Sequence, residues 1–404
     1  MRILYLNPGA QLGGAERVLL DSLASLRIAE PDWELHLISG ELGPLLTEAQ
    51  KLGVSVECVR FSESVAQLGS FGTDVSAALA ASVRALPQLV ANGAALKRRI
   101  RALRPDLIHT HGFKMHLLGA WLSDCPVVWH LHDFVTSRAL MAKALQRSAG
   151  RVRGAIAVSE SVAHDARKVF GRNLPIRTVL NAIDLKRFAR IGPAADLNAK
   201  EGVVRVGMVG TFARWKGHET FLRALAHPRV RATNTQGYII GGPVYRTANS
   251  QWTLDELRNR ARSLDLNDRV TFTGFTAKPA EAMRALDIVV HASTEREPFG
   301  LVIAEAMACG RAVIAAKSGG AEELFRDGID AIGTEPGDVD SLAEAIENLT
   351  AFAGRREFLG RSGAQTAAQN FDRQRLGPQI AEFYRQVLAQ CESFTYTAEI
   401  SSAA

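Results

Sequence analysis

Two glutamates in the second half of the sequence are placed to bind a ligand that carries hydroxyl groups. Glu297 precedes a Pro-Phe-Gly turn, and Glu305 follows eight residues later inside the apolar run "LVIAEAMA". In a helix this spacing is a little over two turns, so both carboxylates lie on broadly one side. A carboxylate accepts two hydroxyl hydrogen bonds at once, which suits the vicinal diol of a ribose. A carboxylate among apolar residues is costly without a partner, so we expect Glu305 to meet a ligand rather than act as a surface residue.

Cations and backbone N–H groups in the same half are candidates for binding a diphosphate. Arg214 and Lys216 follow the strand-like run "VRVGMVG", and two cations at that place can bind a pyrophosphate. The alternative is a basic loop that meets only water. Pro298 favours the first turn of a helix, so the N–H groups of the next three residues are expected to point toward the same ligand. These residues are Phe299, Gly300 and Leu301.

The first half offers a glycine-rich turn and a group of histidines. Gly13 and Gly14 precede a helical run, as in a phosphate-binding loop, although a plain strand-to-helix turn has the same appearance. The spacing is not that of a dinucleotide site. Four histidines end two strand-like runs: His109, His111, His130 and His132. No third ligand type at zinc spacing accompanies them, so we predict no metal, and His132 beside Asp133 is the candidate functional histidine.

Composition indicates an ordinary globular protein. The chain has 404 residues, of which 47% are hydrophobic and 22% charged, enough for two domains with separate cores. The four cysteines show no C-x-x-C or zinc spacing, which argues against a disulfide framework. The sequence begins without a signal peptide and contains no run of 18 apolar residues, so we expect a cytoplasmic protein.

Basic residues are concentrated in residues 84–153. That stretch holds 12 lysines and arginines against three acidic residues. One interpretation is a solvated helix face, and the other is peripheral contact with the anionic inner face of a membrane or with an anionic acceptor. Nucleic acid is a poor partner, because the stretch carries almost no aromatic residues for base stacking.

Short β-branched runs alternate with helical runs along the whole chain, which is typical of α/β folds with parallel sheets. We predict two doubly wound, Rossmann-like domains that face each other across a cleft, with ligands beyond the carboxyl ends of the strands. The predicted divisions are an N-terminal domain (1–190), a linker (191–202), a C-terminal domain (203–375), a terminal helix (376–391) that can cross back to the N-terminal domain, and a frayed tail (392–404). The predicted strands are 2–7, 34–39, 54–61, 107–111, 127–132, 155–159 and 176–181, followed by a second series that begins with "VRVGMVG".

Several motifs together resemble family 4 of the glycosyltransferases, which are retaining enzymes of the GT-B fold. They are "HLHD", "VLNAIDLKRF", "ARWKG", "EPFGLVIAE" and "SGGAEEL". The element E-x7-E with Pro-Phe-Gly after the first glutamate is specific, and each other motif is weak alone. The resemblance covers nearly the whole chain. One departure concerns the Gly-Arg-Leu that the family often has after the first strand of its second domain, because this chain has Gly210-Thr211-Phe212 there.

The resemblance implies a role for each candidate residue. Glu305 would bind the donor ribose, and Glu297 would hold hydroxyls of the transferred sugar. Lys216 would neutralise the diphosphate, with Arg214 in place of the missing family arginine. The remaining candidates are His132 near the donor sugar, Phe275 near the base, and backbone N–H groups of the Gly13-Gly14 loop and of residues 299–301 at the diphosphate.

The function that the resemblance implies is transfer of a sugar from a nucleotide-sugar, with a UDP-sugar favoured, to a glycan or lipid-linked acceptor. The reaction would retain anomeric configuration and need neither a metal nor another cofactor. Cations and helix N–H groups would stabilise the charge on the leaving diphosphate. Two alternatives stay open at this point: a nucleotide-sugar epimerase of the same fold, and a non-catalytic subunit that binds a sugar nucleotide.

Overall fold

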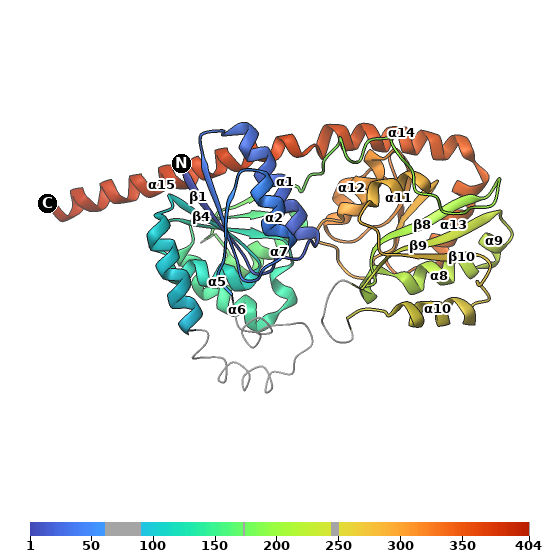
Figure 1. The fold of residues 1–404 in the computed structure, drawn as a ribbon, viewed down its shortest axis with the longest axis horizontal. Coiled ribbons are helices and arrows are strands. Elements are labelled where there is room, and N and C mark those ends of the chain that lie inside the picture. Colours follow the sequence, from blue (N-terminus) through green and yellow to red (C-terminus); the bar gives the residue numbers. More distant parts are fainter. Residues whose placement is uncertain (61–89, 173, 244–249, 404) are drawn as a thin grey trace. The chain divides into compact units, whose positions relative to one another are not determined.

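The computed structural model describes residues 1–60, 90–172, 174–243 and 250–403, with side chains described as far as residue 391 (Figure 1). The chain divides into two compact units. The first unit is Met1–Asn181 together with Arg373–Ala404, and the second is Ala182–Asp372. Each unit is built on its own parallel sheet, as the alternation of strands and helices in the sequence predicts.

The first unit contains a seven-stranded parallel sheet in the order β3-β2-β1-β4-β5-β6-β7. The strand order reverses between β1 and β4, and the residues of β4 and β5 are all buried. Such central strands are buried because helices cover both faces of a parallel sheet. The strands are β1 (Arg2–Asn7), β2 (Glu34–Ser39), β3 (Ser55–Cys58), β4 (Leu107–His111), β5 (Val127–Leu131), β6 (Gly154–Ala157) and β7 (Ile176–Thr178).

Helices lie on both sides of this first sheet (Figure 1). Helices α1 (Gly14–Ala29) and α2 (Pro44–Lys51) are on one side, and α5 (Phe113–Leu122), α6 (Ala139–Ser148) and α7 (Glu160–Phe170) are on the other. Residues 90–103 form a further helix. Two strands predicted to be longer, 54–61 and 176–181, end early as β3 and β7. Both are edge strands, which have a hydrogen-bonding neighbour on one side only.

The C-terminal helix α15 (Leu376–Ala403) belongs to the first unit, where it packs against α1. Just before it, Arg375 Nη2 donates a hydrogen bond of 2.6 Å to the carbonyl of Asn181. The helix runs past residue 391, where the sequence predicts its end. Residues 392–403 contain no glycine or proline that would stop a helix, so polarity alone was a poor guide to its end.

The second unit contains a six-stranded parallel sheet in the order β10-β9-β8-β11-β12-β13. Here the strand order reverses between β8 and β11, so the loops that follow these two strands leave the sheet side by side. The strands are β8 (Val204–Thr211), β9 (Thr235–Gly242), β10 (Val270–Gly274), β11 (Ile288–His291), β12 (Ala312–Ala316) and β13 (Ile332–Thr334).

Helices again cover both faces of the second sheet. In Figure 1, α8 and α10 lie on one side, and α11, α12 and α14 lie on the other. The helices are α8 (His218–Ala226), α9 (Pro228–Arg231), α10 (Leu254–Ser263), α11 (Pro279–Ala285), α12 (Leu301–Ala308), α13 (Val339–Ala351) and α14 (Ala353–Asn370). The predicted fold class, two Rossmann-like parallel-sheet units, is therefore confirmed.

The segment predicted as a linker, 191–202, is part of the second unit, which begins already at Ala182. Arg284 of α11 donates hydrogen bonds to the carbonyls of Pro193 (2.7 Å) and Ala189 (3.0 Å), and Ala195 N donates to Glu281 O (3.0 Å). Glycine and proline in this stretch mark irregular backbone rather than a free connection. The contact with Pro193 comes from a helix residue 91 positions later in the sequence.

Within the residues described, no helix is both long enough and apolar enough to pass through a bilayer.

Candidate functional site

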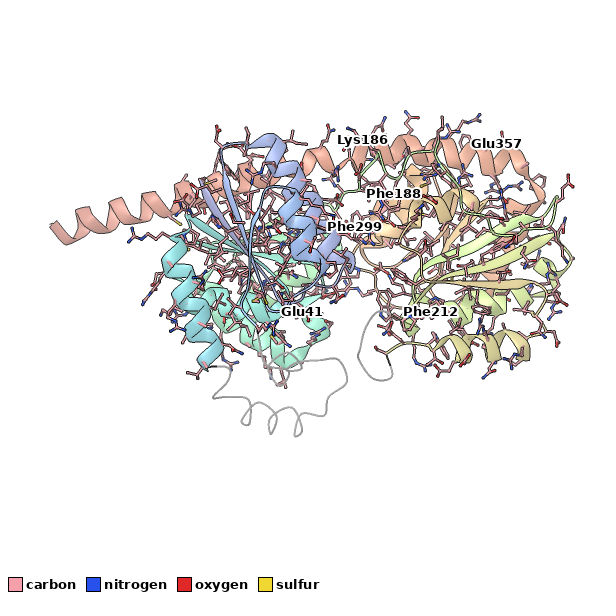
Figure 2. The ribbon with its side chains drawn as sticks, viewed as in Figure 1. Glu41, Lys186, Phe188, Phe212, Phe299 and Glu357 are labelled. Atoms are coloured by element: carbon pink, nitrogen blue, oxygen red, sulfur yellow. The ribbon has the colours of Figure 1, made fainter. Side chains whose placement is uncertain are left out.

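The loop after β8 carries Lys216 and is fixed by a glycine. A short 3-10 turn, Arg214–Lys216, leads to Gly217, which precedes α8 with φ 80°. A β-carbon at Gly217 would lie 1.8 Å from the carbonyl oxygen of Ala292, just beyond β11. Only glycine permits this approach, so Gly217 brings the Lys216 loop against the loop after the neighbouring strand. Phe212, labelled in Figure 2, is 1% exposed in the core beneath the turn.

Glu297 is the centre of the site in the second unit. It is 6% exposed, although it belongs to the loop between β11 and α12. Lys216 Nζ lies 2.7 Å from Glu297 Oε2, and the Ser293 hydroxyl donates to the same oxygen at 3.0 Å. His291 Nε2 lies 3.3 Å from that oxygen as well. The Glu297 carboxylate thus has three protein partners of its own.

The electrostatics of Glu297 are a balance of burial and positive charge. Burial alone would raise the pKa of the carboxyl, but the Lys216 ammonium and the hydrogen bond from His291 hold that pKa well below its usual range. Glu297 is therefore an anion at neutral pH. An anion accepts hydrogen bonds from hydroxyl groups and cannot act as a proton donor.

The Pro-Phe-Gly turn is fixed by backbone and side-chain contacts. Glu297 N donates to Ser318 O at 3.4 Å, and Gly320 N donates to Glu297 O at 2.7 Å. The Phe299 side chain (Figure 2) is 3% exposed and packs edge-on against Phe371, with ring centroids 6.0 Å apart. Because the ring is in the core, the backbone of the turn is what this residue can offer a ligand.

Helix α12 begins directly after this turn. Its N-cap is Gly300, with φ 94°, so Leu301 is the first helical residue. The N–H groups of a first helical turn have no acceptor inside the helix and favour an anion. Glu305 lies in the middle of α12, between the buried residues Ala304 and Ala306, and is itself partly exposed. The structure thus places the second carboxylate where a ligand can reach it, not in the closed core.

Arg214 and Phe275 have different surroundings. Arg214 Nη2 donates to Glu256 Oε1 of α10 at 2.9 Å, and its guanidinium lies 3.9 Å from the centre of the Trp252 ring. Arg214 thus pairs with a residue of α10. Phe275, beyond the end of β10, is 71% exposed, and its Cβ would lie 3.6 Å from a β-carbon at Gly242, the last residue of β9. An exposed ring at the carboxyl end of two strands can stack on a planar group.

The Gly13-Gly14 loop of the first unit has an acidic partner that the sequence analysis did not consider. Gly13 is the N-cap of α1, and its N–H donates to Glu16 Oε2 at 3.1 Å and to Gln11 O at 3.0 Å. Burial raises the pKa of the Glu16 carboxyl. The capping glutamate thus accepts a hydrogen bond from the Gly13 N–H, which is one of the groups that we expected to bind a phosphate.

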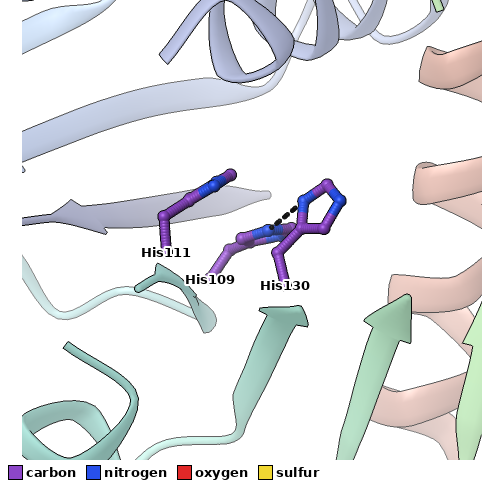
Figure 3. A group of neighbouring side chains, drawn as sticks. All are labelled: His109, His111 and His130. Carbon is purple, nitrogen blue, oxygen red and sulfur yellow. Dashed lines mark hydrogen bonds between the residues drawn. The ribbon is translucent and has the colours of Figure 1, made fainter. Parts of the chain in front are cut away.

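The four strand-end histidines lie together in the first unit. Figure 3 shows His109 and His111 of β4 beside His130 of β5, projecting from the same side of the strands. His130 Nδ1 lies 3.1 Å from His109 Nε2, and His109 Nδ1 contacts the Tyr384 hydroxyl of α15. His132 is partly exposed, and its Nε2 lies 2.8 Å from His111 Nδ1. Burial lowers the pKa of His132 to about 4 and the pKa values of the other three well below the usual 6.5.

This cluster contains enough histidines for a metal site, but most of the ring nitrogens that could bind a metal already take part in hydrogen bonds. One nitrogen from each of His109, His111 and His130 lies within 4.8 Å of the others. In the part of the chain that the structure describes, both nitrogens of His109 and one each of His111 and His130 take part in hydrogen bonds. Unless one of these hydrogen bonds breaks, two nitrogens of the three histidines remain for a metal. A catalytic zinc has three protein ligands. The absence of a bound metal therefore stays a prediction.

Sequence reasoning missed His291 and Ser293, which contact Glu297. They lie two positions apart at the end of β11, and residues two apart along an extended chain face the same side. The available signal was two polar residues at alternate positions after the apolar run "DIVV". Of the predicted site residues, the structure brings together Lys216 and Glu297 in one contact. The roles assigned to the other candidates stay predictions.

Two glycosyltransferase families match the chain. The family described as glycosyltransferase family 4 matches residues 12–187, and that described as glycosyl transferases group 1 matches residues 203–351. The chain is 30% identical, over 53% of its length, to a GDP-mannose-dependent α-(1-6)-phosphatidylinositol monomannoside mannosyltransferase of Mycolicibacterium smegmatis. It is 31% identical, again over 53% of its length, to a D-inositol 3-phosphate glycosyltransferase of Salinispora tropica.

These matches cover 57% and 47% of the two relatives, so the chain spans about half the length of these curated proteins. Similarity to a solved structure is more extensive. The crystal structure of Anabaena HepE in complex with UDP and glucose has a TM-score of 0.78 with this chain. The two are 26% identical, and the similarity covers 95% of this chain and 99% of that one.

Proposed function

This chain belongs to glycosyltransferase family 4, and we propose that it transfers a sugar from a nucleotide-sugar to a glycan or lipid-linked acceptor. The observation that carries this proposal is the contact of the partly exposed Lys216 with the buried Glu297 at the carboxyl ends of β8 and β11. It combines a cation, which suits a diphosphate, with an anion, which suits sugar hydroxyls. Both groups lie where the strand order of the sheet reverses, the usual ligand site in such folds.

The donor that we propose is a UDP-sugar. Support comes from HepE, whose structure contains UDP and glucose and whose similarity extends over 95% of this chain. The mannosyltransferase of M. smegmatis uses GDP-mannose, but its similarity covers only 53% of the chain. In our proposal Phe275 stacks near the base, and Glu305 accepts hydrogen bonds from the ribose hydroxyls.

Lys216 and the first turn of α12 stabilise the leaving diphosphate in the proposed reaction. As the bond between the sugar and the diphosphate breaks, negative charge develops on the phosphate oxygens. Lys216 has three N–H donors and uses one on Glu297, so others are available for those oxygens. The N–H groups of residues 299–301 are fixed by the packing of Phe299, and such preorganised donors need no reorganisation during the reaction.

Glu297 fixes the transferred sugar in this proposal. Its carboxylate is ionised and accepts hydrogen bonds from sugar hydroxyls while the positive charge of an oxocarbenium-like transition state develops nearby. For His132 we keep the role that the family resemblance implies, with an imidazole that is neutral at pH 7. We further propose that the reaction retains the anomeric configuration and uses no metal, with the chain's own cation in the place that a divalent ion takes in other enzymes.

The role of Arg214 is the least direct part of the proposal. Its guanidinium pairs with Glu256 and lies over Trp252. The pair is exposed, with side-chain exposures of 40% and 43%, and exposed ion pairs contribute little to stability. Such a pair is weak enough to exchange Glu256 for a diphosphate. An Arg214→Met variant would then bind UDP more weakly.

The basic stretch of the first unit supports a peripheral contact with an anionic membrane. Residues 84–89 of that stretch lie outside the described residues. In the helix 90–103, Arg98 is exposed, while Arg99 pairs with Glu57 at 2.6 Å and Arg101 lies 3.6 Å from Asp124. Co-sedimentation with phosphatidylserine vesicles that falls with salt, and with charge reversal at Lys97 and Arg98, would support the contact. Binding that neither change affects would count against it.

A thermal-shift panel tests the choice of donor. A ligand that binds only the native protein raises its unfolding temperature, so UDP-, GDP-, ADP- and dTDP-sugars can be ranked directly. We expect the largest shift with a UDP-sugar. A larger shift with GDP-mannose would mean that the donor is GDP-mannose rather than a UDP-sugar. The proposed transferase activity would still stand. No shift with any of these compounds would contradict a sugar-nucleotide site. Recovery of an altered nucleotide-sugar, instead of free diphosphate and glycosylated acceptor, would indicate an epimerase.

A further inference from the structure

The hydrogen bonds of the Glu297 carboxylate are distributed unevenly between its two oxygens. Oε2 lies within hydrogen-bond distance of three groups: Lys216 Nζ (2.7 Å), Ser293 Oγ (3.0 Å) and His291 Nε2 (3.3 Å). Oε1 receives no hydrogen bond from any residue that the structure describes. A carboxylate oxygen normally offers two lone pairs, so Oε2 is fully used and Oε1 is not.

The protonation of the three partners follows from this arrangement. Ser293 Oγ and His291 Nε2 also lie 3.0 Å from each other. Because Glu297 is an anion, a bare nitrogen lone pair facing Oε2 would be repelled, so His291 carries its proton on Nε2. Nδ1 of His291 is then a bare acceptor, which agrees with its lack of a partner in the buried interior. The Ser293 hydroxyl donates to Oε2 and can accept from His291.

The two residues that make these contacts are themselves well fixed. His291 is the last residue of β11 and is 3% exposed, and Ser293 is 0% exposed. Strand β11 lies between β8 and β12 in the sheet. A rigid strand end therefore determines where Oε2 is held, and the backbone bonds of Glu297 to Ser318 and Gly320 fix the other end of the side chain.

We propose that His291 and Ser293 are positioning residues, which hold Glu297 Oε2 so that Oε1 faces the transferred sugar. This inference rests on the proposed function and adds two residues to it. Lys216 alone would hold the carboxylate through one contact and leave it free to rotate. With three donors on one oxygen, the second oxygen has one orientation and is available to a sugar hydroxyl. Preorganised acceptors of this kind bind at a lower entropic cost.

Crystal structures of ligand-free variants test the positioning role without any donor. Ser293→Ala removes the hydroxyl, and His291→Leu removes the imidazole donor while it keeps an apolar side chain of similar size. We expect the Glu297 carboxylate to leave its position or to occupy two orientations in each variant. His291→Gln supplies an N–H donor at nearly the same place and should restore the single orientation. A carboxylate that stays in place in Ser293→Ala and in His291→Leu would overturn the proposal.

Calorimetric titration with UDP and with UDP-glucose tests whether the orientation matters for the sugar. Ser293→Ala and His291→Leu should bind UDP as the wild type does, but should bind UDP-glucose about tenfold more weakly. Adding Ser293→Ala to Glu297→Gln should cause little further loss, because both changes remove one interaction. His291→Gln should recover most of the affinity. Ser263→Ala, at an exposed serine of α10, is the matched control. It should leave the affinities for UDP and for UDP-glucose unchanged.

The outcomes separate this inference from the proposed function. Equal loss of UDP and UDP-glucose, or losses that add fully with Glu297→Gln, would mean that the two residues only support the fold and would overturn the inference. If the wild type binds UDP-glucose no more tightly than UDP, the proposed sugar site at Glu297 is wrong. The crystal structures would then still decide whether His291 and Ser293 orient the carboxylate.

Discussion

At the scale of single residues, the site is defined by an ion pair between positions 81 apart in the sequence. Each of its members was recognisable as a candidate, because Lys216 and Glu297 both follow apolar strand runs. Their contact, and its burial, could not be predicted, because nothing local in the sequence relates the two loops. The same holds for His291 and Ser293, whose roles depend on where Glu297 lies.

Replacement of Lys216 by alanine should destabilise the second unit. It would leave a buried carboxylate without its cation, and breaking such a pair costs about 3–5 kcal/mol. The depressed pKa of Glu297 means that the pair stabilises the fold above the ordinary value of 4.5, and that this contribution is lost as the pH falls through the lower folded value. Thermal unfolding should therefore show a large difference from wild type at pH 7 and a shrinking one below pH 4.5.

The double variant Lys216→Ala/Glu297→Gln is the control for that experiment. With both charges removed, most of the lost stability should return, because no uncompensated charge stays buried. Equal unfolding temperatures of wild type and Lys216→Ala at pH 7 would show that Glu297 is not held as the structure describes.

His132 should not titrate in the range where most enzymes are assayed. Burial lowers its pKa to about 4, so the imidazole is neutral between pH 5.5 and 8. His132→Gln should reduce kcat by about 100-fold if the ring assists the reaction, without changing the shape of the pH profile in that range. An inflection near pH 6.5 in the wild type that disappears in His132→Gln would contradict a ring that is neutral in this range.

At the scale of elements, the sequence predicted the strands well and their packing poorly. The central strands β4 and β5 are buried along their whole length, as expected for a sheet covered on both faces, although β4 carries polar residues at three of its five positions. The edge strands β3 and β7 are shorter than predicted. Segment 191–202 looked like a linker, yet α11 fixes the backbone just before and within it through Arg284 and Glu281. Long-range contacts of this kind leave no local pattern in composition.

Gly217→Ala should displace the loop that carries Lys216. The new methyl group would meet the carbonyl of Ala292 at 1.8 Å, and the backbone at φ 80° is unfavourable for alanine. We expect a fall in unfolding temperature and loss of UDP binding together. Gly354→Ala in α14 is the matched control, because no atom lies within 4 Å of its β-carbon and alanine favours helices by about 1 kcal/mol. A Gly217→Ala variant as stable as Gly354→Ala would refute the close approach.

At the scale of the whole molecule, the two units differ in how they should respond to acid. Four histidines of the first unit are buried and have lowered pKa values: His109, His111, His116 and His130. In the unfolded chain each binds a proton near pH 6.5, whereas the folded unit binds none there. Stability is therefore full above pH 6.5 and falls below it, by about 1.4 kcal/mol per pH unit for each histidine.

Calorimetry between pH 7.5 and 5 should show this difference. The transition of the first unit should move steeply to lower temperature below pH 6.5, by up to about 7 kcal/mol of stability per pH unit, because the lowered pKa of His132 adds to those of the four buried histidines. His116→Leu should reduce that slope by about a fifth, while His164→Gln, at an exposed position on α7, should leave it unchanged. A first unit equally stable at pH 7 and pH 5 would contradict the buried neutral cluster.

The assignment of the whole molecule as a sugar-nucleotide enzyme depends on what Glu297 does, and one assay addresses it directly. Release of UDP from UDP-glucose is measured with wild type and with Glu297→Gln, which keeps the size of the side chain. We expect wild type to release UDP and Glu297→Gln to do so at least about 100-fold more slowly, while it still binds UDP. Equal rates of release by the two proteins would contradict a catalytic site at Glu297.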